Sequence, residues 1–84
     1  MPEFHYFSGK NILFTGKFKN MNRYEAAQKV VNRGGKCYNH YWRGIDMLIA
    51  GDNKGKISRK LKIAIEKGIE VISEQDLYKY ILLY

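Results

Sequence analysis

Residues suited to anion binding follow a short apolar run near the N-terminus. The run at 12–14 (Ile-Leu-Phe) suits a buried strand, and it ends in Thr15, Gly16 and Lys17. A helix start follows at Asn22. A glycine lets the backbone approach a ligand, and a helix N-terminus supplies unpaired N–H groups and a positive dipole end. This arrangement favours an anion site, although the same residues also suit a plain turn.

The charge of the chain points to a polyanionic partner. Fifteen basic against eight acidic residues give 84 residues a formal net charge of +7. This balance favours nucleic acid first, an acidic or phosphorylated protein second and a membrane surface third. The alternative is that a basic surface only keeps the domain soluble. The basic residues gather after the first apolar run and again in the second half of the chain, at Lys17, Lys19 and Arg23 and at Lys54, Lys56, Arg59, Lys60 and Lys62.

The length predicts a single domain over residues 1–84, with a core at about 7–82. A chain this short buries roughly 60% of the surface that its unfolded form exposes, which leaves little room for an enzyme with a deep cleft and a lid. No Ser-His-Asp or Cys-His arrangement and no paired carboxylates stand out. We therefore expect no catalytic residue, and favour a binding module or a fragment of a larger protein.

Cysteine and histidine usage predicts neither a disulfide nor a metal. Cys37 is the sole cysteine, and His5 and His40 stand at spacings unsuited to zinc. Residues 1–5 lack the features of a signal peptide, and no stretch approaches transmembrane length. We expect no cofactor, no membrane partner and a reducing setting, cytoplasmic or, in a eukaryote, nuclear rather than secreted.

The positions of apolar runs and turn residues predict seven elements in the order β-α-β-β-α-β-α. Strands are expected at 11–15, 36–40, 47–50 and 70–72, and helices at 23–33, after Ser58 to about 67, and after Ser73. Helices that link strands imply a mostly parallel α/β sheet with helices on both faces. Ligands gather beyond the carboxyl ends of such strands, where Thr15 and Gly51 would lie.

Capping residues and apolar periodicity predict how each helix starts and which face it buries. Asn22 with Glu25, and Ser73 with Asp76, form capping boxes, and Ser58 is an N-cap. The expected inward faces are Tyr24, Ala27, Val30 and Val31 in the first helix, Leu61, Ala64 and Ile65 in the second with Ile57 leading in, and Leu77, Tyr80 and Ile81 in the last.

Two features suggest functions that we set aside. The segment 51–58 lies between a strand and a helix as a P-loop does. It has three rather than four residues between its glycines, and Ile57 replaces the Ser or Thr that would hold magnesium. Tyr38, Tyr41 and Trp42 could stack on bases, but such a cluster more often packs on a sheet edge or meets another domain. The aromatic residues at 4–7 are expected at the domain edge.

Five short motifs, none decisive alone, occur in order at specific spacings. They are Gly9-Lys10-x-x-x-Phe14-Thr15-Gly16, Met21-x-Arg23-x-Glu25-Ala26, Gly34-Gly35-Lys36, Asp46-Met47-Leu48-Ile49-Ala50-Gly51 and Gly68-Ile69-x-Val71-Ile72-x-Glu74. Together they resemble a BRCT domain over about residues 7–82. The resemblance implies a four-stranded parallel sheet of order 2-1-3-4, flanked by two helices on one side and one on the other.

Within this family, the chain looks most like the class found in bacterial NAD-dependent DNA ligases and the large subunit of replication factor C. Members of this class bind DNA, and the replication factor C type recognises the 5′-phosphate of a DNA end. The resemblance implies that the phosphate-binding roles fall on Thr15, Gly16, Arg23 and Lys60. Lys56 or Lys62 takes the lysine role if the second helix starts differently, because the loop after Gly51 is two residues longer than usual.

The chemistry of these four residues suits a phosphate. The Thr15 hydroxyl and the Gly16 N–H can each donate a hydrogen bond, Arg23 offers a planar fork, and Lys60 offers a mobile point charge. An arginine in a first helical turn opposes the helix dipole unless an anion lies there. Further contacts to the DNA backbone, without sequence reading, are expected from flanking lysines: Lys17, Lys19 and Lys56.

The sequence therefore predicts a non-catalytic module that binds DNA, with the 5′-phosphate of a nick or end as its target, inside a replication or repair protein such as a DNA ligase. A second hypothesis is a protein-interaction module for a phosphorylated or unmodified partner, including other domains of the parent protein. A third is an architectural domain with a vestigial pocket. One departure from the family bears on the choice: Leu77 stands where many members have Trp, which fits the ligase-like class better than tandem phosphopeptide-binding repeats.

Overall fold

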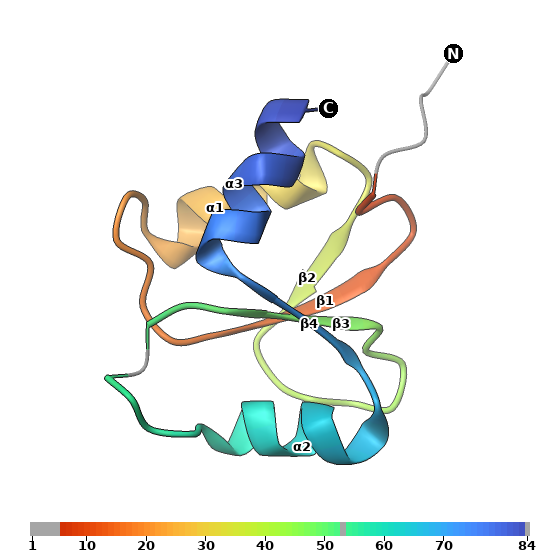
Figure 1. The fold of residues 1–84 in the computed structure, drawn as a ribbon. Coiled ribbons are helices and arrows are strands. Elements are labelled where there is room, and N and C mark those ends of the chain that lie inside the picture. Colours follow the sequence, from red (N-terminus) through yellow and green to blue (C-terminus); the bar gives the residue numbers. More distant parts are fainter. Residues whose placement is uncertain (1–5, 53, 84) are drawn as a thin grey trace.

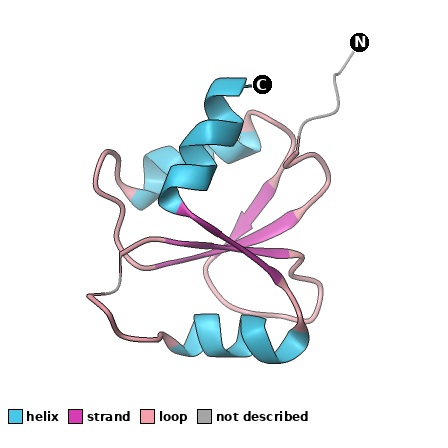
Figure 2. Cartoon of the chain, viewed as in Figure 1, coloured by secondary structure: helices cyan, strands magenta, loops and turns pink. Residues whose placement is uncertain are grey.

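The computed structural model describes residues 6–52 and 54–83, and these form a parallel sheet between two helical layers (Figures 1 and 2). The strands are β1 (Asn11–Thr15), β2 (Lys36–Tyr38), β3 (Met47–Ala50) and β4 (Glu70–Ser73), in the order β2-β1-β3-β4. The helices are α1 (Arg23–Val31), α2 (Arg59–Lys67) and α3 (Glu74–Leu83). This confirms the expected α/β order and the 2-1-3-4 sheet.

Helices α1 and α3 cover one face of the sheet, and α2 covers the other (Figure 1). Side chains alternate between the faces along each strand. Ile12 and Phe14 of β1 therefore join the core under α1 and α3, while Leu13 between them packs toward α2. The same alternation directs Thr15 toward α2.

The two cores differ in size. The core under α1 and α3 contains Phe7, Ile12, Phe14, Ala26, Val30, Met47, Ile49, Ile72 and Leu77. The core under α2 contains Leu13, Ile45, Leu48 and Ala64. Most of the buried apolar surface, and hence most of the hydrophobic stabilisation, lies on the α1/α3 side.

The helix starts follow the predicted caps. Asn22 Oδ1 accepts the Glu25 N–H at 2.8 Å, and Glu25 Oε1 accepts the Asn22 N–H at 3.3 Å, which completes a capping box. Ser73 and Asp76 exchange the same pair of bonds at 3.1 and 3.5 Å. Gly68 ends α2 in the left-handed conformation at φ +71°. The predicted caps are therefore confirmed. Each capping bond joins residues within a single helical turn, so it depends on local sequence alone.

The predicted buried faces of α1 and α2 are partly wrong. Tyr24 is 76% exposed and Val31 is 48% exposed, whereas α1 buries Ala26 and Val30. The residues of α1 that are buried against the sheet therefore form a narrow stripe with a spacing of four residues. On α2, Ile65 is 64% exposed and Ile57 before it is 68% exposed, because this helix meets only the small second core.

Smaller differences concern the strands and the N-terminal aromatic residues. Strand β2 ends at Tyr38 rather than at residue 40, and β4 extends to Ser73. Phe7 is fully buried in the α1/α3 core rather than at the domain edge, and Tyr6 stacks on Tyr80 with ring centroids 4.0 Å apart. Phe4, also expected at the edge, lies outside the described residues.

Candidate phosphate site

Thr15 ends β1 on the face that α2 covers, and its side chain reaches the start of that helix. It is 7% exposed, and its Oγ1 donates to Ser58 Oγ at 3.1 Å. Ser58 in turn caps α2, because its Oγ accepts the Leu61 N–H at 3.1 Å. The sequence identified Ser58 as a cap but missed its contact with Thr15. The two hydroxyls lie together at the carboxyl end of β1.

Gly16 is required by the backbone as well as available to a ligand. Its φ is +79°, and a Cβ at this position would lie 2.8 Å from the Gly51 carbonyl carbon. A Cβ at Gly51 would lie 2.5 Å from the Lys17 oxygen. The loops after β1 and β3 thus touch through two glycines, and Lys17 and Asp52 exchange backbone hydrogen bonds of 2.9 and 2.8 Å beside them. The plain-turn interpretation therefore explains part of the need for glycine.

Arg23 points back from the first position of α1 to the end of β1. Its Nη2 donates to the Gly16 carbonyl oxygen at 3.0 Å, while the side chain stays exposed. This contact uses one of the five guanidinium donors. The remaining donors are available at the mouth of the site.

Lys60 approaches the same strand end from α2. Its Nζ donates to the Phe14 carbonyl oxygen at 3.1 Å, and the side chain is half-buried. Burial, and secondly the positive charge of Arg23, lower the pKa of Lys60 below the ordinary lysine value. An anion between Arg23 and Lys60 would favour the charged form and offset both effects. The fold thus holds two cations close together.

These two cations have no acidic partner among the residues that the structure describes. Within residues 6–52 and 54–83, the hydrogen bonds of the Arg23 and Lys60 side chains go to main-chain carbonyl oxygens. The ion pair found in this part of the chain, Lys10 with Glu70, involves neither of them. Two neighbouring positive charges without a carboxylate create a local positive potential, which would attract an anion.

The other predicted lysines lie at varying distances from this centre. Lys17 lines a hollow together with Gly16, Phe18, Asn22 and Arg23. Lys56 and Lys62 are exposed, and Lys62 is two residues from Lys60, which places it on another face of α2. The structure thus brings Lys60 to the end of β1 and places Lys62 on another face of α2.

An acidic residue, Glu74, lies beside Lys19, which the sequence predicts as a DNA contact. Its backbone N–H donates to Glu74 Oε2 at 2.8 Å, and its charge helps to lower the pKa of Glu74. Partial neutralisation by this carboxylate reduces what Lys19 can contribute to an anion.

Cys37 and the aromatic cluster add no chemistry to the site. Burial raises the pKa of the Cys37 thiol to about 11, and its Sγ donates to the Ala27 oxygen at 3.7 Å. Tyr38 and Trp42 form an edge-to-face pair with centroids 5.3 Å apart, while Tyr38 and Tyr41 pack against the α2 core. This matches the expected packing role, and leaves Trp42 43% exposed.

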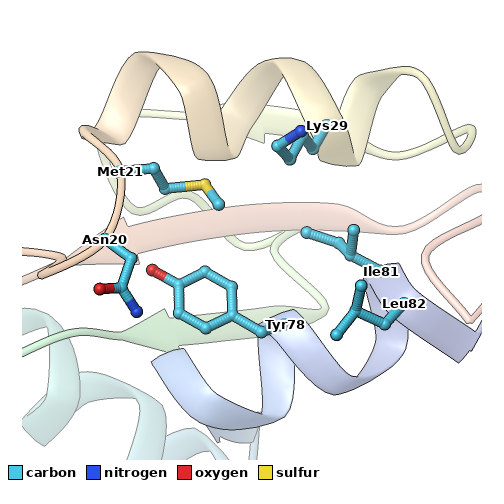
Figure 3. Close-up of a pocket in the computed structure, with 6 residues that line it drawn as sticks. All are labelled: Asn20, Met21, Lys29, Tyr78, Ile81 and Leu82. Atoms are coloured by element: carbon cyan, nitrogen blue, oxygen red, sulfur yellow. The ribbon is translucent and has the colours of Figure 1, made fainter.

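A separate groove between α1 and α3 contains none of the predicted site residues. Figure 3 shows its lining, which is mainly apolar: Asn20, Met21, Lys29, Tyr78, Ile81 and Leu82. In the part of the chain that the structure describes, no cluster of His, Cys, Asp or Glu could hold a metal ion, and no helix has the length and apolar character needed to cross a bilayer.

Comparison with known proteins now identifies the family. The model of the BRCA1 C Terminus (BRCT) domain matches residues 2–81, so the chain belongs to the BRCT family. It is 42% identical over 71 residues to a DNA ligase of Francisella philomiragia subsp. philomiragia, and 41% identical over 71 residues to DNA ligases of Francisella tularensis subsp. novicida and subsp. tularensis. Each alignment covers 84% of this chain and 10% of the relative. The resemblance drawn from the motifs is confirmed, and the chain spans about a tenth of the length of the curated relatives that it matches.

Proposed function

We propose that this domain is a non-catalytic DNA-binding module that recognises a phosphate, the 5′-phosphate at a nick or end, within a DNA replication or repair protein such as a DNA ligase. The observation that carries the proposal is the placement of Arg23 and Lys60 at the end of β1, without an acidic partner among the described residues. The kinship with DNA ligases supports DNA as the source of the phosphate.

The proposed contacts are of two kinds, charged side chains and directional hydrogen-bond donors. Arg23 and Lys60 supply positive charge, and the Gly16 N–H supplies a short donor at the strand end. The Thr15 hydroxyl has one donor, which would turn from Ser58 Oγ to the phosphate when the ligand binds. A hydrogen bond to a charged group contributes about 1.5–3 kcal/mol. A terminal phosphate carries close to two charges, against one for an internal phosphodiester, so the pair of cations favours an end over the continuous backbone.

The proposal is tested by comparing two DNA hairpins that differ only in a 5′-phosphate or a 5′-hydroxyl. Affinity is measured by fluorescence anisotropy at several salt concentrations. We expect the chain to bind the phosphorylated end about tenfold or more tightly, the effect of one charged hydrogen bond. Affinity for both hairpins should fall steeply with salt, because cations that bind phosphates release counterions.

Variants assign the preference to the site. In Arg23→Ala or Thr15→Ala, the ratio of the two affinities should fall towards one, with weak binding to both hairpins retained. Lys62→Ala is the matched control, because it removes one positive charge from another face of α2. It should weaken binding to both hairpins equally and leave the ratio unchanged.

A phosphothreonine peptide in the same assay tests the protein-interaction hypothesis. If the proposal is right, the peptide should not displace phosphorylated DNA, even at concentrations that would saturate a phosphopeptide-binding domain. Equal affinity of the wild type for the phosphate and hydroxyl hairpins would contradict 5′-phosphate recognition. Displacement by the peptide together with weak DNA binding would favour a phosphoprotein partner.

A further inference from the structure

A second hollow adjoins the candidate phosphate site and shares Arg23 with it. Its volume is about 320 Å³. It lies between the start of α1 and the end of β2. Its lining consists of Phe14, Arg23, Tyr24, Ala27, Cys37 and Asn39.

The lining of this hollow has two kinds of surface. Phe14 is 2% exposed, and Ala27 and Cys37 are half-buried, so these three form an apolar floor. Tyr24 and Asn39 are exposed at its rim. An apolar floor with an aromatic ring and an amide at the rim suits a flat ligand that has apolar faces and polar edges.

Tyr24 is the unusual member of this group. Its side chain is 76% exposed, and neither its ring nor its hydroxyl contacts another described residue through a ring pair or hydrogen bond. The helix does not use it for packing, because α1 buries Ala26 and Val30 instead. Its neighbour in the chain, Arg23, reaches the proposed phosphate site, and both residues line this hollow.

We infer that this hollow binds the nucleoside attached to the recognised 5′-phosphate, with its base against the Tyr24 ring. The inference rests on the proposed function, because the phosphate at Arg23 is what brings the nucleoside to the hollow. A base that lies in this hollow cannot at the same time be paired and stacked in a duplex. The site therefore favours a 5′-phosphorylated end whose terminal base is unpaired.

The experiment uses three hairpins with a 5′-phosphate on the terminal nucleotide: one with that base paired, one with an unpaired thymine, and one with an abasic residue. Each also has a 5′-hydroxyl counterpart. We expect the wild type to bind the unpaired thymine end at least about fivefold more tightly than the abasic end, the low end of what base–aromatic stacking contributes.

Variants at position 24 separate the ring from the phosphate contacts. Tyr24→Ala should bind the thymine and abasic ends equally, while its preference for phosphate over hydroxyl is kept. Tyr24→Phe retains the ring and should retain the preference for thymine. Trp42→Ala, which removes another exposed aromatic side chain, is the control and should behave as the wild type.

Two outcomes would overturn the inference and leave the proposed function standing. One is equal binding of thymine and abasic ends by a wild type that still prefers phosphate, and the other is an unchanged preference for thymine in Tyr24→Ala. A wild type without phosphate preference on any hairpin would contradict the proposed function, and the nucleoside inference with it.

Discussion

The two faces of the sheet have different tasks. Among the described residues, the α1/α3 face holds nine buried apolar residues and the α2 face holds four. Yet the lightly packed face supplies Lys60 of the candidate site from the first turn of α2, and the cap of that helix, Ser58, contacts Thr15. Stability is concentrated on one side, while the ligand-facing geometry depends on a helix that is held by few apolar contacts.

Polar contacts at the end of β1 compensate for this sparse packing. The Thr15–Ser58 bond and the Lys60–Phe14 bond tie α2 to β1, and Arg23 ties α1 to the same strand end. A phosphate that replaced or joined these contacts would bind both helices at once. Ligand binding is therefore expected to stabilise α2 more than α1.

The largest difference in stability between the two faces is expected when one leucine in each core is truncated to alanine. Leu77→Ala on the α1/α3 face should lower the free energy of unfolding by about 3–5 kcal/mol, because it leaves a cavity in the larger core. Leu48→Ala on the α2 face should cost less, about 2–3 kcal/mol, because α2 can settle onto the sheet. Urea unfolding followed by circular dichroism measures both. Equal losses would show that the two cores are equally rigid.

The next prediction concerns the contact between the loops after β1 and β3, which touch through Gly16 and Gly51. Gly16 and Gly55 have φ values of +79° and +77°, but only at Gly16 would a Cβ meet other atoms within 4 Å. Gly55→Ala should cost about 1 kcal/mol, the penalty for an L-residue in this conformation. Gly16→Ala should cost about 1 kcal/mol more, because backbone must move as well.

Thermal unfolding of the two variants compares them directly. If Gly16→Ala and Gly55→Ala were equally stable, the close approach of Gly16 to Gly51 would carry no energy. A larger loss in Gly16→Ala that is also accompanied by loss of DNA binding would link the junction to the site.

Loss of the α2 cap should have a smaller effect. Ser58→Ala removes the acceptor of the Leu61 N–H and the partner of Thr15, and should cost about 1 kcal/mol. Ser58→Asp keeps a capping acceptor but places a negative charge beside the site. Chemical denaturation should show the first variant destabilised and the second close to wild type, whereas phosphate preference should fall most in the second.

The smallest effect concerns Glu74, on the α1/α3 face. Burial acts to raise its pKa, but hydrogen bonds from the Tyr78 hydroxyl and from the Lys19 and Asn20 amides outweigh this and lower it. A folded-state pKa below the unfolded value means that the ionised carboxylate stabilises the fold above the ordinary glutamate pKa of 4.5. That contribution is lost as the pH falls through the lowered value.

Glu74→Gln isolates this contribution. As the pH is lowered from above 4.5 through the folded-state pKa of Glu74, the wild type should lose slightly more stability than the variant, measured by urea unfolding at each pH. Parallel pH profiles would show that the loop at residues 19–20 is not anchored by this carboxylate.

Much of the architecture was readable from local pattern. The caps at Asn22, Ser58 and Ser73, the apolar strand at 47–50 and the glycine at 68 each act within a few residues, so sequence alone identifies them. The motif series added the strand order and the family. Thr15 and Gly16 were candidates from the local pattern of a strand followed by a glycine, and the resemblance to the family added Arg23 and Lys60.

Only the tertiary structure decided which faces are buried and which groups meet. Apolar periodicity placed Tyr24 inward on α1, but the sheet accepts only the Ala26–Val30 stripe, and the ring lies beside the second hollow. Ser58 and Thr15 are 43 residues apart, and Lys60 and Phe14 are 46 apart. Contacts at such separation depend on parallel strand register and on how a helix returns across the sheet, which no local pattern contains.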